Sequence, residues 1–187
     1  MSVRTTLLDG VREELRTKSW AEVKMADVAR AAGVSRQTLY NEFGSRGELA
    51  QAFVLREADL FLDAVQEAVI ANRDDAVAAL GAAFEVFLTT AAEDPLVRSL
   101  LGGGAGTEDL LPLVTTQGEP VLVRATTRLN AFLLEGWPEI DPAKTLLLAE
   151  ATVRLAISYA ALPAGPAGMT GEAIARLLGP FVREALD

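Results

Sequence analysis

The sequence predicts an all-α protein of about nine helices, with an N-terminal three-helix domain that contains a helix-turn-helix and a larger helical domain after it. Three observations favour this fold class. Apolar residues recur at intervals of three and four residues along most of the 187-residue chain. Half of the residues are hydrophobic, and Ala and Leu, which both favour helices, dominate among them. No stretch shows the strict alternation of apolar and polar residues that is typical of a half-buried strand.

The composition excludes several classes of protein. The chain has no Cys and no His, so it offers no disulfide framework, no thiolate metal site and no imidazole base. No apolar run reaches the roughly 18 to 20 residues that span a bilayer, and the N-terminus lacks the apolar core of a signal peptide. We therefore expect a soluble cytoplasmic protein that holds no metal or other cofactor, has no membrane partner and is not an enzyme.

The charges are distributed unevenly along the chain. The formal net charge is −9. Residues 1–50 carry eight basic and seven acidic residues, whereas residues 51–187 carry nine basic and nineteen acidic ones. Phosphate therefore repels the second segment and not the first. Because the positive margin of the first segment is small, its non-specific binding to nucleic acid should be weak and strongly dependent on salt.

Local signals indicate the first three helices. A helix with one apolar face is expected over Thr5–Lys18. Two short helices follow within residues 24–49. The first of them ends at Gly33, which tolerates a left-handed backbone, and the second spans Arg36 to about Phe43 behind Ser35, a strong N-cap. Two short helices joined by a tight turn form a helix-turn-helix, whose second helix enters the DNA major groove.

The rest of the chain is predicted to form further helices. Ser45 and Glu48 favour a capping box that begins a helix running to about Ala71, which is roughly 40 Å at 1.5 Å per residue. Such a helix is long enough to connect two domains, which we place at residues 1–50 and 51–187, and rotation of its far end would move the recognition helix. Further helices are expected over residues 75–92, 95–101, 119–135 and 143–162 and from residue 170 onward, with a helical turn within 108–116.

One ordered set of residues in the N-terminal segment is highly specific. The set consists of Trp20, Val23, Asp27, Val28, Ala29 to Gly33, Val34, Ser35, Thr38, Leu39, Tyr40, Phe43, Ser45, Arg46, Glu48 and Leu49. With this set the chain resembles the TetR family of bacterial transcriptional regulators. The resemblance implies an all-helical homodimer with an N-terminal DNA-binding domain and a C-terminal effector-binding and dimerisation domain. Repression of transcription, rather than activation, is implied by the family alone.

Eight residues are candidate DNA contacts. The candidate base readers are Arg36, Gln37, Thr38 and Asn41. Arginine can pair with guanine and glutamine with adenine in the major groove, and the first turn of a recognition helix reaches the bases first. The predicted phosphate contacts are Lys24, Ser35, Tyr40 and Arg46. Lys24 and Arg46 are included because the family usually carries a Thr and a Lys that meet phosphate at these positions. Any one of the eight could instead be an ordinary polar surface residue, and Glu42, which phosphate would repel, is expected to point away from DNA.

Dimerisation is the second inference. One recognition helix reads only a few base pairs, and two-fold symmetry normally supplies the rest of the site. The two C-terminal helices of each subunit are expected to form a four-helix bundle. The residues that this interface would bury are Leu147, Leu155, Leu177 and Phe181. The alternative, that these residues close the core of a single subunit, stays open.

An effector pocket is the third inference. The candidate lining residues are Phe84, Phe87, Leu88, Leu100, Leu129, Phe132, Leu133 and Tyr159. They supply more apolar area than a small helical bundle needs, and few polar residues accompany them. A bound molecule would therefore be mostly apolar, such as a lipid or a fatty acid derivative. Core packing explains the same residues equally well.

The sequence thus favours a ligand-responsive transcriptional repressor that a hydrophobic small molecule releases from double-stranded operator DNA. The alternative is a helical lipid-binding or carrier protein whose DNA-binding domain has no function. An enzyme is disfavoured because the acid–base groups that the sequence offers, Glu85, Glu150 and Tyr159, form no readable arrangement.

Overall fold

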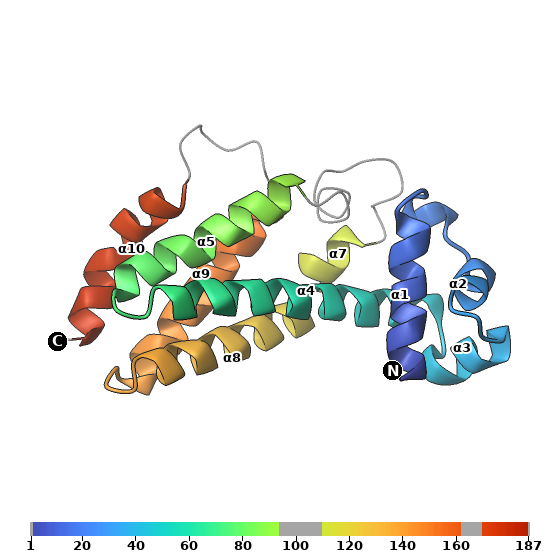
Figure 1. The fold of residues 1–187 in the computed structure, drawn as a ribbon, viewed down its shortest axis with the longest axis horizontal. Coiled ribbons are helices and arrows are strands. Elements are labelled where there is room, and N and C mark those ends of the chain that lie inside the picture. Colours follow the sequence, from blue (N-terminus) through green and yellow to red (C-terminus); the bar gives the residue numbers. More distant parts are fainter. Residues whose placement is uncertain (1, 94–109, 162–169, 187) are drawn as a thin grey trace.

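The computed structural model describes residues 2–93, 110–161 and 170–186. Its elements are α1 (Val3–Leu15), the 3-10 helix η1 (Trp20–Glu22), α2 (Met25–Ala31), α3 (Arg36–Phe43), α4 (Arg46–Ala71), α5 (Ala76–Glu93), α7 (Leu111–Val114), α8 (Glu119–Gly136), α9 (Pro142–Ala161) and α10 (Gly171–Leu186). These residues contain no strand, and the predicted all-α class is confirmed (Figure 1). The helix that the sequence predicts over residues 95–101 lies outside the described residues.

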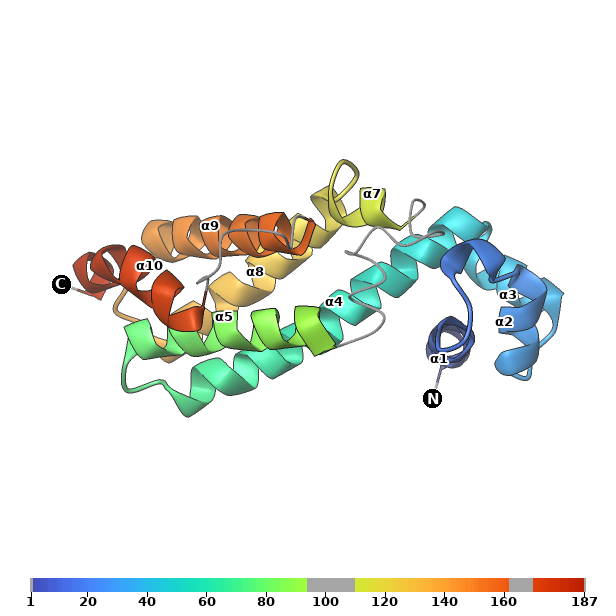
Figure 2. The same cartoon turned by 90° about the horizontal axis from the view of Figure 1, so that it is seen from above.

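Helix α4 connects the two ends of the molecule. Figures 1 and 2 show α1, α2 and α3 gathered at one end of α4, and α5, α8, α9 and α10 gathered around its other half. The helix has 26 residues, which is about 39 Å at 1.5 Å per residue. It begins where the sequence predicts, because the Ser45 hydroxyl accepts a hydrogen bond from the backbone N–H of Glu48 (3.2 Å).

A shared apolar core holds the first three helices against the start of α4. Its fully buried side chains include Leu7 of α1, Trp20, Val28 of α2, Leu39 of α3 and Phe53 of α4. The turn between α2 and α3 forms as predicted. Gly33 takes a positive φ of 68° at the end of α2, and glycine adopts this conformation without the steric penalty of a Cβ. The predicted helix-turn-helix is therefore present, with α3 as its second helix.

The first helix is shorter than the sequence predicts. We expected it to reach Lys18, and it ends at Leu15. The three residues that follow form a hydrogen-bonded turn instead, in which the backbone N–H of Lys18 donates to the Glu14 carbonyl (3.1 Å). The chain then enters η1, whose start is fixed because the Ser19 N–H donates to the Glu22 carboxylate (2.9 Å).

In the larger group of helices, α5 and α10 pack closely through two glycines. A Cβ at Gly171 would lie only 2.2 Å from the carbonyl oxygen of Gly81. A side chain at this position would therefore force the two helices apart. The backbone N–H of Gly171, at the first turn of α10, donates to the Glu85 carboxylate of α5 (2.9 Å). A carboxylate at this end of a helix also complements the helix dipole.

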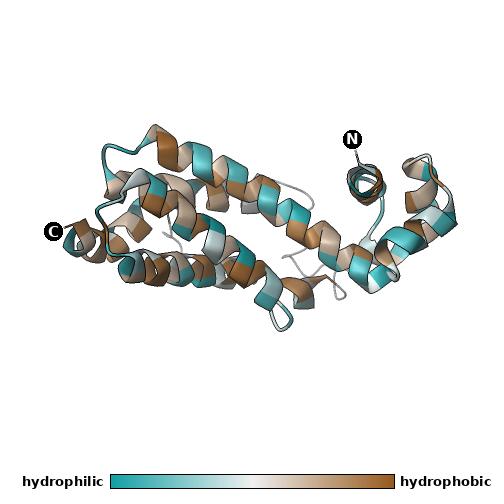
Figure 3. Cartoon of the chain, turned by 90° about the horizontal axis from the view of Figure 1, so that it is seen from below, coloured by the Kyte–Doolittle hydropathy of each residue, from teal (hydrophilic) through white to brown (hydrophobic). Residues whose placement is uncertain are grey.

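Hydropathy follows the packing of the helices. Figure 3 shows hydrophilic and hydrophobic residues alternating along α4, as in a helix with one face in a core and the other in solvent. Among the described residues, no helix combines the length and the apolarity that crossing a lipid bilayer requires.

Candidate functional site

The polar side of α3 faces away from its own subunit. Leu39 and Phe43 bury the opposite side of the helix, with exposed fractions of 0% and 5%. Arg36, Gln37 and Asn41 are all exposed. In Figure 1, α3 lies at the outer end of the molecule, beyond α4. The predicted base readers are therefore presented on one outward surface, with Thr38 half-buried among them.

Hydrogen bonds order the side chains along this surface. The Ser35 hydroxyl accepts from the backbone N–H of Thr38 (3.0 Å) and lies 2.9 Å from the Thr38 hydroxyl. One turn further along, Nε2 of Gln37 donates to Oδ1 of Asn41 (2.8 Å). Tyr40 is exposed on the same helix. Four of the candidate residues thus start from defined side-chain positions before any DNA is bound.

The two candidates outside the recognition helix differ in their surroundings. Lys24 is exposed at the N-cap of α2, and its side chain makes no capping hydrogen bond. Arg46 is half-buried, donates to the backbone carbonyl of Trp20 and lies 4.7 Å from the centre of the Trp20 ring. The structure therefore leaves Lys24 facing solvent and engages Arg46 within its own domain.

Arg4 is a residue of this surface that sequence reasoning missed. Its guanidinium lies 3.2 Å from the Glu42 carboxylate and 4.7 Å from the centre of the Phe43 ring, both on α3. Because Arg4 and Glu42 are 38 positions apart, no local pattern in the sequence predicts the pair. The carboxylate of Glu42 is thus directed to α1.

A second ionic cluster fastens α1 to α4. The Arg56 guanidinium donates to the Asp9 carboxylate (2.6 Å) and to the Leu8 carbonyl (3.0 Å). Beside it, Arg12 pairs with Glu57, whose side chain is only 8% exposed. Four charged side chains therefore connect α1 to α4, and α1 shares its apolar core with the helix-turn-helix.

A third cluster connects α4 to α8. Arg124 holds both oxygens of the Asp59 carboxylate (2.8 and 2.6 Å), and Arg128 bonds to Asp59 and to Asp63 (3.2 and 2.6 Å). Burial alone would raise the pKa of Asp59, but the hydrogen bonds and charges of Arg124 and Arg128 outweigh it and lower that pKa below its ordinary value. The cluster ties the middle of α4 to the larger group of helices.

An apolar cavity of about 50 Å³ lies between α4, α5, α8 and α9. Four of the predicted ligand residues line it: Phe84, Phe87, Leu129 and Leu133. Three others, Leu88, Phe132 and Tyr159, are not among its lining residues, and Leu100 lies outside the described residues. The side of the cavity that sequence reasoning missed is formed by α4, through Phe61, Leu62, Val65 and Val69.

Aromatic rings close one part of this cavity, and one polar group lies in its wall. Phe87 packs edge-to-face on Phe61 and on Phe84, with ring centres 5.8 and 5.6 Å apart. Tyr159 packs edge-to-face on Phe84, with ring centres 6.1 Å apart. The polar group is the hydroxyl of Thr152, which is buried and has no hydrogen-bond partner among the described residues. The cavity is thus apolar, with a single hydroxyl.

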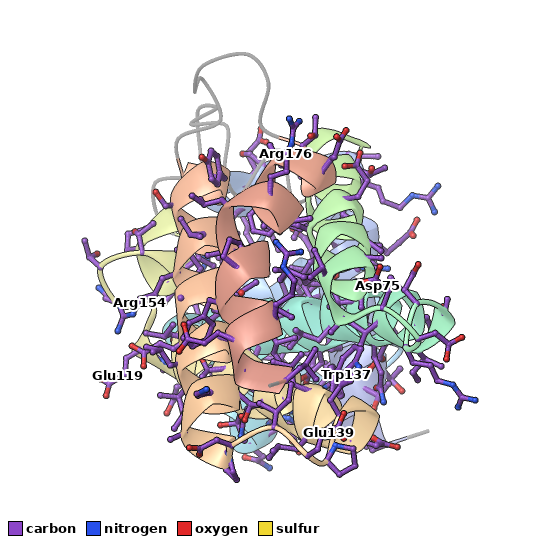
Figure 4. All side chains as sticks on the ribbon, turned by 90° about the vertical axis from the view of Figure 1, so that its left-hand side faces the viewer. Asp75, Glu119, Trp137, Glu139, Arg154 and Arg176 are labelled. Atoms are coloured by element: carbon purple, nitrogen blue, oxygen red, sulfur yellow. The ribbon has the colours of Figure 1, made fainter. Side chains whose placement is uncertain are left out.

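The four predicted interface residues lie on α9 and α10 in two different environments. Leu147 and Leu177 are 59% and 64% exposed, whereas Leu155 and Phe181 are half-buried against the subunit's own core. Figure 4 looks onto this end of the molecule, where α9 and α10 lie side by side and carry Arg154 and Arg176. Arg154 pairs with Glu150 of α9, and Arg176 pairs with Glu172 of α10. The charges here are therefore balanced locally, while large apolar side chains stay exposed.

Within the described residues, no cluster of three or more acidic groups could hold a metal ion.

Two protein families match the sequence. The bacterial regulatory proteins of the tetR family match residues 7–53, and the bacterial tetracyclin repressor C-terminal domain matches residues 75–180. The chain is 41% identical to the HTH-type transcriptional regulator AlkX of Mycobacterium tuberculosis, over 96% of this chain and 84% of that protein.

Solved structures give the same result. The TetR family repressor AlkX from Dietzia sp., implicated in biodegradation of n-alkanes, is 33% identical over all of this chain and 98% of that one, with a TM-score of 0.86. A TetR-family regulator from Streptomyces coelicolor shares the fold, with 19% identity over 99% of this chain and 100% of that one and a TM-score of 0.60. This chain therefore belongs to the TetR family of bacterial transcriptional regulators, which are DNA-binding proteins and not enzymes.

Proposed function

We propose that this protein is a dimeric repressor that binds operator DNA through α3 and that an apolar small molecule releases it. The observation that carries the proposal is the exposed polar side of α3, whose other side is anchored by Leu39 and Phe43. Such a helix is rigid, is directed outward and has the dimensions of the major groove. The regulator acts where bacterial DNA lies, in the cytoplasm.

Base reading is assigned to Arg36, Gln37, Thr38 and Asn41, and phosphate contact to Lys24, Ser35, Tyr40 and Arg46. The exposure of Arg36, Gln37 and Asn41 supports the first assignment. Arg46 would meet phosphate through N–H groups other than the one that it donates to the Trp20 carbonyl. Two copies of α3 must be spaced by about 34–36 Å to read successive major grooves, and the exposed Leu147 and Leu177 support a dimer through α9 and α10.

The cavity supports a mechanism for release. Sites for drug-sized molecules occupy about 300–1,000 Å³, far more than the roughly 50 Å³ between these helices, so a bound effector needs them to move apart. Helix α4 supplies Phe61 and Val65 to the cavity wall and is fastened to α1 through Arg56. An effector therefore selects a conformation in which α4 is displaced, and the two recognition helices lose the spacing of the operator.

The lining residues and one relative define the effector class that we propose. The cavity wall is apolar apart from Thr152. The Dietzia relative is implicated in n-alkane biodegradation. We propose a long-chain hydrocarbon or its oxidised derivative, such as a fatty acid, as the effector. We also retain residues 1–50 and 51–187 as the DNA-binding and the effector-binding and dimerisation domains.

DNA binding is tested by fluorescence anisotropy with the region upstream of the protein's own gene, at several salt concentrations. We expect specific binding whose affinity falls steeply with salt, and a large loss for Arg36→Ala. Fatty acids and n-alkanes of matched chain length are then added to the complex, and an effector should release the DNA. The absence of any salt-dependent binding by the wild-type protein would overturn the proposal.

The effector site is tested with a matched pair of variants. Ala83 lies in the cavity wall and is buried, whereas Ala64 of α4 is exposed. Ala83→Val fills the cavity and should abolish release by the effector while DNA binding persists, and Ala64→Val should leave both unchanged. If Ala83→Val is released as readily as the wild type, the effector binds elsewhere.

A carrier protein with an inactive DNA-binding domain is the second candidate. The observation that favours it is the engagement of the half-buried Arg46 with Trp20, which limits the reach of a predicted phosphate contact. A carrier would bind fatty acids and raise its melting temperature with them, yet show no salt-dependent DNA binding. The anisotropy experiment above therefore separates the two candidates.

A further inference from the structure

The recognition helix carries a carboxylate close to the surface that is to meet DNA. Glu42 lies in the last turn of α3, where its negative charge offsets the positive charge of Arg36 at the start of the same helix. Phosphate charges act across a Debye length of about 8–10 Å at physiological salt, so a free carboxylate here would oppose docking. The N-terminal segment has little positive charge in reserve, because residues 1–50 carry eight basic against seven acidic residues.

Arg4 lies directly against this carboxylate. Its Nη1 is 3.2 Å from Oε1 of Glu42, and its guanidinium lies 4.7 Å from the centre of the Phe43 ring. The Glu42 side chain is 33% exposed and that of Arg4 is 51% exposed, so the pair lies at the protein surface. Figure 1 shows the N-terminal end of α1 beside α3. Exposed ion pairs contribute only about 0–1 kcal/mol to stability, so removal of this pair should leave the protein folded.

We propose that Arg4 is a positioning residue for DNA binding: it neutralises Glu42 and holds its carboxylate towards α1, so that α3 approaches phosphate without a free negative charge. The inference rests on the proposed binding of DNA by α3. In this role Arg4 acts through Glu42 and makes no phosphate contact of its own. Without Glu42, Arg4 is therefore dispensable.

The test compares four proteins in the anisotropy assay: the wild type, Arg4→Ala, Glu42→Gln and the double variant. We expect Arg4→Ala to weaken operator binding by about tenfold, because the freed carboxylate faces like charge. Glu42→Gln should bind at least as tightly as the wild type, because it frees the positive charge of Arg4. The double variant should return to within about threefold of the wild type, because it contains neither charge.

A control separates this role from the loss of one positive charge. Arg16→Ala changes the net charge by the same amount, but Arg16 follows the far end of α1 and pairs only with Glu13 on its own helix among the ion pairs of the described residues. It should change the affinity by less than about twofold. The melting temperature of each variant shows that it is folded, and Arg4→Lys, which keeps the charge, should retain most of the binding.

The salt dependence gives a second readout. A residue that contacts one phosphate lowers the slope of log K against log salt by about 1 when it is removed. The double variant should instead keep the wild-type slope. A double variant that stays as weak as Arg4→Ala, or that loses about 1 in slope, would show that Arg4 itself meets phosphate and would overturn the inference. A wild-type protein that binds no DNA overturns the proposed function instead.

Discussion

Gln37 and Asn41 are joined across one turn of α3: Nε2 of Gln37 donates to Oδ1 of Asn41 at 2.8 Å. The bond leaves the Gln37 carbonyl oxygen as an acceptor and the Asn41 amide nitrogen as a donor. Base edges in the major groove present the complementary groups, a donor on adenine or cytosine and acceptors on purines and on thymine. We therefore propose that the two amides act as one base-reading unit.

We expect the substitutions Gln37→Ala and Asn41→Ala to be non-additive in operator binding. Each removes a contact and also frees the remaining amide to rotate, so the double variant should lose less than the sum of the single losses, by about 0.5–1 kcal/mol. Affinities of the four proteins for the same DNA measure this coupling. Gln37→Ala combined with Lys24→Ala is the control, because Lys24 lies on a different helix and the losses should add. Additive losses for Gln37 and Asn41 would contradict the unit.

The close approach of α5 and α10 makes Gly171 sensitive to any side chain. Gly171→Ala places a Cβ about 2.2 Å from the Gly81 carbonyl oxygen and forces the backbones apart. We expect the free energy of unfolding to fall by about 1–3 kcal/mol. Gly136→Ala is the matched control, since nothing lies within 4 Å of a Cβ there, and it should be neutral or slightly stabilising. Urea unfolding at one protein concentration gives both values, and equal stabilities would refute the packing argument.

The Asp59 cluster should make stability depend on pH in a defined direction. The pKa of Asp59 is lowered in the folded state, so its contribution is present above its ordinary pKa of 3.8 and is lost as pH falls through the folded value. Asp59→Asn should therefore cost about 2 kcal/mol near neutral pH, and the difference from the wild type should shrink below about pH 4. Asp63→Asn, which removes a more exposed partner of Arg128 alone, should cost about 1 kcal/mol or less. If the stability difference between Asp59→Asn and the wild type instead grows below pH 4, the argument from the lowered pKa is wrong.

The exposed apolar residues of α9 and α10 predict where the interface of the proposed dimer lies. Leu177→Glu should convert the dimer to a monomer without unfolding it, because the side chain is 64% exposed in the subunit. Ile70→Glu on α4 changes an apolar residue outside these helices that is 56% exposed, and it should leave the mass unchanged. Light scattering after gel filtration measures both. A dimeric Leu177→Glu protein would place the interface elsewhere.

The unpartnered hydroxyl in the cavity wall predicts a stabilising substitution. Thr152→Val keeps the shape of the side chain and removes a buried hydroxyl that lacks a partner, so the ligand-free protein should gain about 1 kcal/mol. Thr145→Val gives the opposite sign, because the equally buried hydroxyl of Thr145 donates to the Pro142 carbonyl (3.0 Å). Melting temperatures of the two variants decide the matter: a destabilised Thr152→Val protein would mean that the hydroxyl is satisfied.

The parts of the site that depend on local chemistry could be predicted from the sequence. Gly33 and Ser35 define the turn and the start of α3, and the apolar spacing of Leu39 and Phe43 indicates which side of that helix is buried. These signals are local because a cap or a left-handed turn is fixed by one or two residues. The exposed side of α3, and with it the candidate base readers, follows directly.

Contacts between distant helices could not be predicted in this way. Periodicity shows that Phe61 and Val65 of α4 share an apolar face, but not that they face Phe84 of α5 across a cavity. The ion pair of Arg4 with Glu42 and the engagement of Arg46 with Trp20 likewise join elements whose relative orientation is a property of the whole fold. Their charges are visible in the sequence, whereas their partners are not.

The salt bridges that join α1 to α4 have a consequence for protein engineering. Arg56 and Glu57 lie beyond residue 50, yet their partners Asp9 and Arg12 belong to the first helix. A hybrid regulator could fuse the DNA-binding domain, cut at residue 50, to the effector-binding domain of another protein. Asp9 and Arg12 would then lie opposite unrelated side chains. The fusion point should lie after Glu57, within α4. The DNA-binding domain is then transferred together with Arg56 and Glu57, which hold α1 in place.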